Sequence, residues 1–148
     1  MAFRYSLESV LRLRRSLERQ EEQQLFGTAA MVARLRGDIE HLENEHFGQK
    51  RRAFQEISSG SSGAVLHFMA VCDAAYTETR KALLRQLEHA EKKRMEQLEI
   101  YKLARQARET FEGLRDRKEE AYNFDFARHE QQSTDEAFLL RLSSNSIE

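Results

Sequence analysis

Proline is absent from all 148 residues of this sequence. At the usual proline frequency of ~5%, roughly seven would be expected in a chain of this length. Proline removes a backbone donor and clashes with the preceding turn, so its absence lets helices continue over long stretches. The sequence also contains only 6 glycines and no tryptophan, which argues against a β-sandwich or barrel with many tight turns. These features predict an all-α fold built from long helices.

The charge content favours a thin helical structure that does not bind nucleic acid. Charged residues make up 33% of the chain and apolar residues 40%, a balance that suits helices with large solvated surfaces better than a thick core. The 24 basic and 25 acidic residues leave a formal net charge of -1. No global positive field is therefore present to hold nucleic acid or an anionic membrane. We expect no nucleic-acid partner and no direct membrane insertion.

Several features favour a cytoplasmic location. The single cysteine, Cys72, has no partner for an internal disulfide, which fits a reducing compartment. The opening residues, Met1 to Ser6, contain no apolar segment typical of an export signal. The longest apolar stretch, Ala64 to Cys72, is far shorter than the roughly 20 residues that span a bilayer. We expect a cytoplasmic protein that reaches membranes only through its partners.

One segment has the composition of a turn between two helices. Residues 58–63 read Ser-Ser-Gly-Ser-Ser-Gly, and glycine and serine at such positions allow left-handed backbone and cap helix ends. Ser6 is a suitable N-cap for the first helix. The sequence therefore predicts helix one over about 6–57, a turn over about 58–63 and helix two over about 64–142.

Both helices carry mainly apolar residues at alternating spacings of three and four, the pattern of a coiled-coil seam. In helix one the seam consists of Leu25, Thr28, Val32, Leu35, Ile39, Leu42, His46, Gln49 and Ala53. In helix two it consists of Met69, Cys72, Tyr76, Leu83, Leu87, Ala90, Leu98, Tyr101, Ala104, Phe111 and Leu114. The turn between them predicts an antiparallel two-helix coiled-coil hairpin, a single elongated domain over residues 1–148.

A symmetric turn would set the register of the two helices and leave part of helix two without a partner. It places Leu17 by Leu103, Leu25 by Met95, and Leu35 by Leu84 and Leu87. Helix one then ends at Ser6, opposite about Leu114, and residues 115–148 have nothing in the chain to pack against. These residues nevertheless include Tyr122, Phe124, Phe126, Phe138, Leu139, Leu140 and Leu142. We expect a longer second helix that overhangs at the end bearing both termini and docks into another protein.

No residues in the sequence have the spacing of a metal or catalytic site. His41 and Glu45 are one helical turn apart, but His46 lies about 140° around the helix from His41. The two imidazoles therefore cannot share one ion. Cys72, with His67 nearby, is interpreted as a small packing residue. Because the chain also lacks a phosphate-binding glycine loop and a nucleophile elbow, we expect no enzymatic activity, no metal and no cofactor.

Both ends of the sequence carry a recognisable motif. Residues 3–14 read Phe-Arg-Tyr-Ser-Leu-Glu-Ser-Val-Leu-Arg-Leu-Arg, and residues 128–136 read Arg-His-Glu-Gln-Gln-Ser-Thr-Asp-Glu. These motifs resemble the opening and the C-terminal motif of the flagellar export protein FliJ family. That family usually places a basic residue where this chain has Leu140, and here Arg141 follows one position later.

The resemblance implies a stalk-like coiled coil similar to the central stalk of rotary ATPases. Such proteins insert the end bearing both termini into the hexameric export ATPase FliI, promote its assembly and activity, engage the export-gate membrane protein FlhA and assist export chaperones. The residues implied to face the ATPase are Phe3, Arg4, Leu7, Arg128, Gln131, Asp135 and Glu136, and the predicted overhang adds Tyr122, Phe124 and Phe126. The gate-binding surface is placed nearer the hairpin tip, around Leu42, His46, Phe47, Met69 and Tyr76.

Other interpretations stay open on the sequence alone. These residues hardly distinguish a flagellar stalk from the equivalent coiled-coil stalk of a virulence type III secretion system. A generic structural adaptor and a parallel dimeric coiled coil would show similar heptads. A coiled coil that binds nucleic acid is opposed by the even charge balance.

Overall fold

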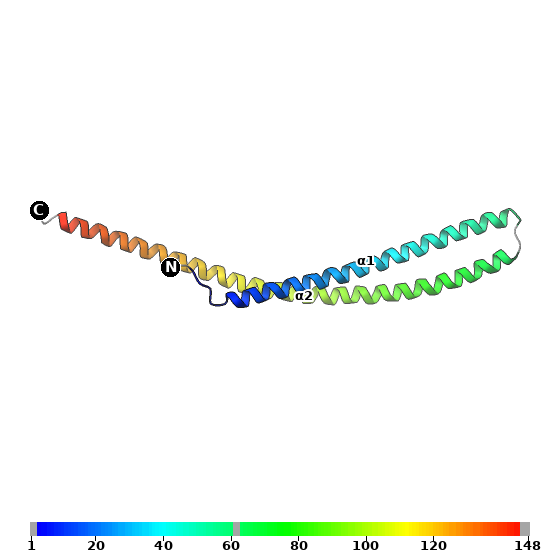
Figure 1. Cartoon of the computed structure of the whole chain (residues 1–148), viewed down its shortest axis with the longest axis horizontal. Helices are drawn as coiled ribbons and strands as arrows, with labels where there is room; N and C mark the ends of the chain where they lie inside the picture. The colour runs from blue at the N-terminus through cyan, green and yellow to red at the C-terminus, as the bar shows by residue number, and fades with distance from the viewer. Residues whose placement is uncertain (1–2, 61–62, 146–148) are drawn as a thin grey trace. The chain divides into compact units, whose positions relative to one another are not determined.

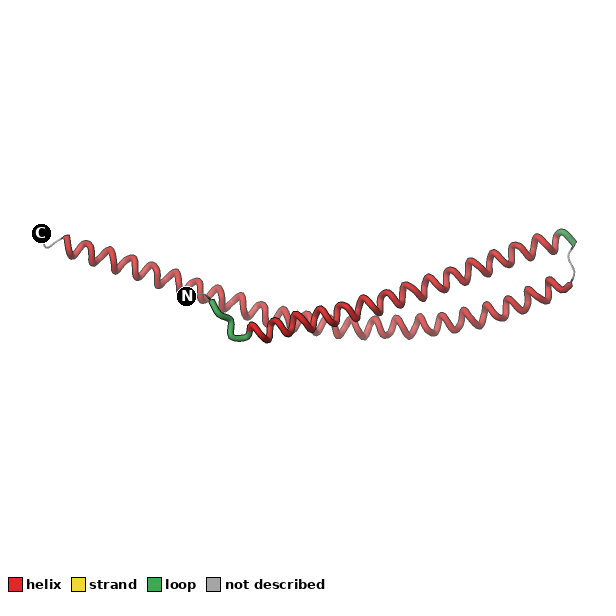
Figure 2. The backbone as a smooth tube through the Cα atoms, in the orientation of Figure 1, coloured by secondary structure: helices red, strands yellow, loops and turns green. Residues whose placement is uncertain are grey.

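The chain forms two long α-helices joined by one turn. The computed structural model describes residues 3–60 and 63–145, with only the backbone of Asn145. Helix α1 spans Glu8–Ser58 and helix α2 spans Gly63–Asn145 (Figure 1). Within the described residues there is no strand, and the two helices pack against each other (Figure 2). The predicted all-α helical hairpin is confirmed, and the chain itself supplies both helices of the pair.

The helix bounds differ slightly from the predicted ones. Helix α1 begins at Glu8 rather than at about residue 6, because the carbonyl of Tyr5 accepts a hydrogen bond from the Glu8 N–H at 3.2 Å and holds a turn there. Helix α2 begins at Gly63 and continues to Asn145, beyond the predicted end at about 142. Within the predicted turn, Ser61 and Ser62 lie outside the described residues.

Glycine is required at the end of α1. Gly60 has a φ of 96°, a left-handed conformation that strains any residue with a Cβ. The Ser59 N–H donates to the carbonyls of Gln55 and Glu56, both at 3.2 Å, and the Gly60 N–H donates to the Ile57 carbonyl at 3.1 Å. These bonds satisfy carbonyls that the last helical turn leaves free.

Two glycine-to-alanine substitutions are expected to have opposite effects on stability. Gly60→Ala forces a Cβ into left-handed backbone and lowers the free energy of unfolding by about 1 kcal/mol. Gly37→Ala, in the exposed interior of α1 where an added Cβ meets nothing within 4 Å, raises it by up to ~1 kcal/mol. Urea unfolding followed by circular dichroism measures both. Equal shifts of the same sign would contradict the assigned end of α1.

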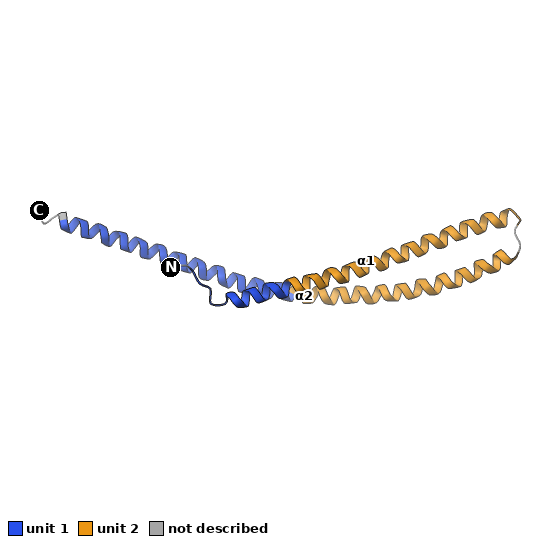
Figure 3. Ribbon diagram, viewed as in Figure 1, with its two compact units in different colours: residues 1–18, 103–148 blue, residues 19–102 orange. Residues whose placement is uncertain are grey.

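Contacts between Cα atoms divide the chain into two compact units (Figure 3). Unit 1 consists of Met1–Glu18 and Leu103–Glu148, and unit 2 of Arg19–Lys102. Each unit therefore contains a stretch of α1 that runs antiparallel to a stretch of α2.

The core of unit 2 lies where the predicted seam is richest in aliphatic residues. Val32, Leu35 and Ala90 are buried, and Leu83 and Leu87 pack against them. Leu87 packs against the cluster that contains Leu35, as predicted, whereas Leu84, the other predicted neighbour, is 37% exposed and Leu83 packs in its place.

Three further residues of unit 2 that were predicted to pack between the helices are exposed. Met95 is 70% exposed, so it does not pack against Leu25 as expected. Leu98 and Gln49 are also exposed, and the buried position on this part of α2 belongs to Gln97. The Gln97 amide donates to the Glu21 carbonyl at 3.2 Å and to the Glu21 carboxylate at 2.6 Å. These bonds satisfy a polar group that would otherwise be costly to bury.

Unit 1 has a small core next to the start of α1. Leu11 is fully buried and Tyr5 is 8% exposed. The Tyr5 hydroxyl donates to the Phe111 carbonyl at 3.2 Å. The predicted pairing of Leu17 with Leu103 is wrong, since Leu103 is 66% exposed.

The unpartnered part of α2 is shorter than predicted. Glu8 lies 3.9 Å from Arg115, Lys118 lies over the Tyr5 ring at 5.8 Å, and the rings of Phe3 and Tyr122 have centroids 5.7 Å apart. The segment before α1 reaches this far because non-helical chain advances up to ~3.3 Å per residue, against ~1.5 Å in a helix. The overhang therefore begins after Tyr122 rather than at Arg115.

Candidate functional site: an exposed helical extension

The side chains of the last part of α2 are exposed. We call residues 123–145 the extension; each of its side chains from Asn123 to Ser144 is exposed. Several of these are large and apolar, with exposed fractions from 47% to 70%: Phe124, Phe126, Phe138, Leu139, Leu140 and Leu142. An exposed set of this size on one helix indicates an interaction surface.

The exposed residues of the extension fall on distinct faces of the helix. At about 100° per residue, positions spaced by three and four share a face. One face, which we call the docking face, combines Phe124, Arg128, Gln131, Asp135, Phe138, Leu139 and Leu142. Its apolar residues lie at the two ends and its polar residues lie between them. Tyr122 and Phe126 lie on the opposite face, and Glu136 lies to one side.

Three of the predicted ATPase-facing residues contact one another. The ring centroids of Phe3 and Tyr122 are 5.7 Å apart, and those of Tyr122 and Phe126 are 6.3 Å apart. Phe3 and Tyr122 are half-buried by this packing. Tyr122 is therefore part of the intramolecular packing, which differs from its interpretation as an unpartnered aromatic residue.

The remaining predicted residues at the N-terminus lie beside this aromatic group. Arg4 is exposed and Leu7 is half-buried. Arg4 and Phe3 line a hollow of about 390 Å³, together with Tyr5, Glu8 and Arg115. The residues of the opening motif are thus brought against α2 just before the extension begins.

An ion-pair network that the sequence analysis missed holds the two helices of unit 1 together. Arg108 donates from Nε to Glu18 Oε2 at 2.7 Å and from Nη2 to Glu18 Oε1 at 3.2 Å. Arg108 also donates to Glu112, which accepts a bond from Arg15 at 2.8 Å. The hydrogen bonds that Arg108 donates to Glu18 and then to Glu112 raise the pKa of its guanidinium. A register with Arg108 opposite Glu18 would have revealed this network.

The network predicts that unit 1 loses stability in acid. Hydrogen bonds from Arg15 and then Arg108 lower the pKa of Glu112 below its ordinary value. A depressed carboxyl pKa contributes stability that is present above the unfolded pKa of about 4.3 and is lost as the pH falls through the folded value. Glu112→Gln is expected to flatten this acid dependence by about 1 kcal/mol or less, since the pair is partly exposed.

Thermal unfolding followed by circular dichroism between pH 7 and pH 3 measures this acid dependence. The matched control is Glu99→Gln, which breaks only the exposed pair of Glu99 with Lys102. A pH profile of Glu112→Gln equal to that of the wild type would contradict the role of the network.

Four of the five predicted gate-binding residues lie between the helices of unit 2. Leu42, His46, Met69 and Tyr76 are half-buried. The rings of His46 and Tyr76 are stacked with centroids 3.8 Å apart, and His46 Nε2 lies 3.0 Å from Asp73 Oδ1. Phe47 differs from the others because it is 64% exposed.

The residues considered for a metal or a catalytic role have structural partners. His41 Nε2 lies 3.5 Å from Glu45 Oε1, and Cys72 is half-buried between the helices. Among residues 3–60 and 63–145, no group of His, Cys, Asp and Glu is arranged to hold a metal ion. No helix in the same ranges has a stretch long and apolar enough to cross a bilayer.

A protein-family model described as flagellar FliJ protein matches residues 3–147. Neither the curated proteins nor the solved structures contain a match to the chain.

Proposed function

Because the chain belongs to the FliJ family, and is thereby a component of the flagellar export apparatus, we propose that it is the non-enzymatic stalk of the hexameric export ATPase. In this proposal the extension and the neighbouring N-terminal residues insert into the hexamer and promote its assembly and activity. The observation that carries the proposal is the run of exposed side chains from Asn123 to Ser144. The family match supports a flagellar apparatus over a virulence one.

The composition of the docking face suits a binding surface that needs both apolar and polar contacts. Fully burying one Phe or Leu side chain stabilises a complex by roughly 1.5–3 kcal/mol, so Phe124, Phe138, Leu139 and Leu142 together supply at most about 6–12 kcal/mol. The loss of freedom on association costs an estimated ~4–15 kcal/mol. The two quantities are similar, so net affinity depends on the polar middle of the face. Arg128, Gln131 and Asp135 supply that part.

A hexameric ring surrounds whatever lies in its centre, so contacts on several faces of the extension are consistent with this role. Phe126 and Glu136 lie away from the docking face and would meet other parts of the ring. Phe3, Arg4, Leu7 and Tyr122 would contact its rim. The packing of Phe3 on Tyr122 fixes the N-terminal segment in place before binding, which lowers the ordering cost.

Stimulation of the ATPase requires differential binding. A stalk that bound every state of the ring equally would shift no equilibrium, however tight the complex. The proposal therefore requires that the extension contacts one assembled state of the ring better than the others. Such a preference would raise both the hexamer population and the turnover rate.

The test is to mix the protein with the export ATPase of the same organism and measure hexamer formation by light scattering and ATP turnover. The full chain is expected to increase both, and a variant that ends at residue 126 is expected to increase neither. Because the side chains that the structure describes in the removed segment, 127–144, are all exposed, the hairpin should keep its thermal unfolding midpoint. Equal stimulation by the truncated and full chains would overturn the proposal.

We further propose that unit 2 binds the export gate through Phe47 and its surroundings, and that the chain also assists export chaperones. Phe47 is exposed, and the Arg51 guanidinium lies 5.0 Å from its ring. Leu42, His46, Met69 and Tyr76 would act mainly by fixing the helix that presents Phe47. Through the gate, the protein would be held at the membrane export apparatus by a partner while remaining in the cytoplasm.

Phe47→Ala is expected to weaken binding to the purified export-gate protein by tenfold or more, because truncating an exposed aromatic anchor typically costs over ~1.4 kcal/mol. The matched control is Phe26→Ala, a similarly exposed phenylalanine on the same helix. Calorimetric titration measures both affinities. Equal affinities for the two variants would contradict the placement of the gate surface.

A further inference from the structure

The two helices of unit 2 are not equally well packed along their length. We call residues 19–35 and 83–102 the proximal segment, and residues 37–58 and 63–82 the distal segment, which includes the helix ends next to the turn (Figure 3). Each side chain that the structure describes in the distal segment is at least partly exposed. The buried side chains described in unit 2 all belong to the proximal segment: Val32, Leu35, Ala90 and Gln97.

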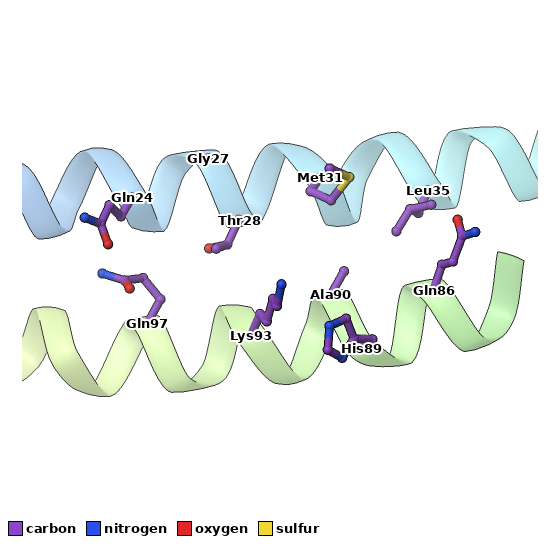
Figure 4. A pocket seen from close by; sticks show the side chains of 10 residues that line it. All are labelled: Gln24, Gly27, Thr28, Met31, Leu35, Gln86, His89, Ala90, Lys93 and Gln97. Atoms are coloured by element: carbon purple, nitrogen blue, oxygen red, sulfur yellow. The ribbon is translucent and has the colours of Figure 1, made fainter.

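Apolar side chains from both helices hold the proximal segment together. Leu35 of α1 and Ala90 of α2 point into the space between the helices (Figure 4). Leu83 and Leu87 pack against the cluster that these residues form with Val32. Because long helices are stabilised mainly by the packing of an apolar face, separating α1 from α2 here requires the loss of this buried surface.

A small cluster of polar and aromatic side chains connects the helices of the distal segment. The rings of His46 and Tyr76 are stacked with centroids 3.8 Å apart. His46 Nε2 also lies 3.0 Å from Asp73 Oδ1. We call His46, Asp73 and Tyr76 the latch. A polar residue on a coiled-coil seam specifies the register but lowers stability relative to an aliphatic one, so the latch aligns the helices without holding them tightly.

The ion pairs of the distal segment add little to its stability. Lys50 Nζ lies 3.4 Å from Asp73 Oδ1, and Arg80 Nε lies 3.0 Å from Glu43 Oε1. These four side chains are 42–44% exposed. Ion pairs with that degree of exposure contribute little because water and salt screen them.

Small and polar seam residues leave space between the helices of the distal segment. Gln49 and Ala53 occupy two successive seam positions of α1. Residues of both helices line two hollows here, of about 250 and 390 Å³, and Gln49 lines both. Ala53 lines the larger hollow beside Val65 and Phe68. Space of this kind forfeits the contacts that a close-packed seam would make.

We propose that the distal segment opens as a separate unit while the proximal segment stays packed. In the open form α1 and α2 separate near the turn and the latch comes apart. This opening breaks polar contacts and a half-buried seam, whereas opening of the proximal segment also breaks the apolar cluster around Leu35. Local openings of one protein differ in free energy for such reasons, so the distal segment opens far more often.

The opening regulates the proposed contact with the export gate, and this step rests on that proposal. Phe47 follows His46 directly, so the closed latch fixes the part of α1 that presents Phe47. Affinity for a partner falls in proportion to the fraction of molecules in the competent form. The gate protein therefore binds the closed form and holds the distal segment shut.

Hydrogen exchange of the free full chain, followed by mass spectrometry, tests the opening. After correction for intrinsic rates, the amides of residues 41–56 and 65–80 are expected to exchange at least tenfold faster than those of residues 25–35 and 84–97. Equal protection of the two sets would overturn the proposal.

Leu35→Ala separates a local opening from the unfolding of the whole unit. Leu35 is 7% exposed, and removal of its side chain weakens the proximal segment in the closed and in the open form alike. The exchange of residues 25–35 and 84–97 is therefore expected to accelerate at least tenfold, while that of the distal amides stays within twofold. Equal acceleration in both segments would show that unit 2 opens as one unit and would overturn the proposal.

Two substitutions in the distal segment are expected to move its exchange in opposite directions. Tyr76→Ala removes a ring of the latch and should accelerate distal exchange at least tenfold. Ala53→Leu fills part of the larger hollow and should slow it at least fivefold. The control Ala30→Leu, at an exposed position of α1, should leave it within twofold. Equal exchange in Ala53→Leu and Ala30→Leu, or no effect of Tyr76→Ala, would overturn the roles assigned to the hollow and the latch.

Addition of the purified export-gate protein tests the regulatory step. It is expected to slow distal exchange at least tenfold, because a partner that binds only the closed form suppresses opening. Unchanged distal exchange within a complex that forms would overturn this step. Failure of any complex to form would instead refute the gate contact, a result on which exchange in the free protein does not depend.

Discussion

Replacing Phe124, Phe138 and Leu142 together by alanine is expected to abolish stimulation of the export ATPase. These residues form the apolar ends of the docking face and are 52–70% exposed. Truncating an apolar anchor at an interface costs ~1 kcal/mol or more, so three such changes should weaken binding by roughly 100-fold. ATP turnover measured against the concentration of the stalk protein gives this effect directly.

A second triple variant provides the control. Phe26, Met95 and Leu103 are 66–70% exposed but lie outside the extension. Replacing them by alanine removes a comparable exposed apolar surface and should leave stimulation unchanged. Both triple variants should keep the helicity of the wild type, since none of the six side chains is buried. Equal loss of stimulation in both would show that the effect is a general one of surface hydrophobicity.

Leu11→Ala is expected to produce the largest loss of stability from a single substitution. Leu11 is fully buried in unit 1, and deleting a buried leucine side chain costs about 2–5 kcal/mol, including the cavity left behind. The change should shift the urea unfolding midpoint without changing helicity at zero denaturant. Leu13→Ala is the matched control, since Leu13 is 57% exposed and an exposed substitution costs within ~0.5 kcal/mol. Similar midpoints for the two variants would contradict the assigned core of unit 1.

The sequence was sufficient to predict the helical hairpin. The absence of proline and the serine and glycine residues at 58–63 mark two helices and one turn, and these are strong local signals. Val32, Leu35 and Ala90 were on the predicted seam and form the core of unit 2. The two helices and the centre of the core could therefore be predicted from local sequence patterns.

The register between the two helices could not be predicted from the sequence with the same accuracy. Leucine is frequent on both helices, so Met95 and Leu103 matched partners in the predicted register although both are exposed. Gln97 is buried in place of Leu98 because its amide donates hydrogen bonds to the carbonyl and the carboxylate of Glu21. A hydrophobic pattern contains no information on such a polar contact, because the pattern assigns polar residues to the surface.

The overhang of the second helix was predicted in outline, but the residue at which it begins was not. The unpartnered extension follows from the unequal helix lengths, and its exposed side chains bear that out. The packing of Phe3 on Tyr122 was missed, because the prediction treated residues before the helix as if they advanced at the helical rise. The separation of Phe124 from Phe126 onto opposite faces follows from helix geometry once the helix is known to continue through both.

The central claim is that the extension is the segment that docks into the ATPase ring, and hydrogen exchange tests it most directly. In the free protein, the side chains of residues 123–144 are all exposed, so their amides should exchange rapidly through local opening with a free energy near zero. Addition of the assembled export ATPase is expected to slow exchange across this segment while leaving the amides around Val32 and Ala90 unchanged. Unaltered exchange in residues 123–144 within a complex that forms would contradict the account.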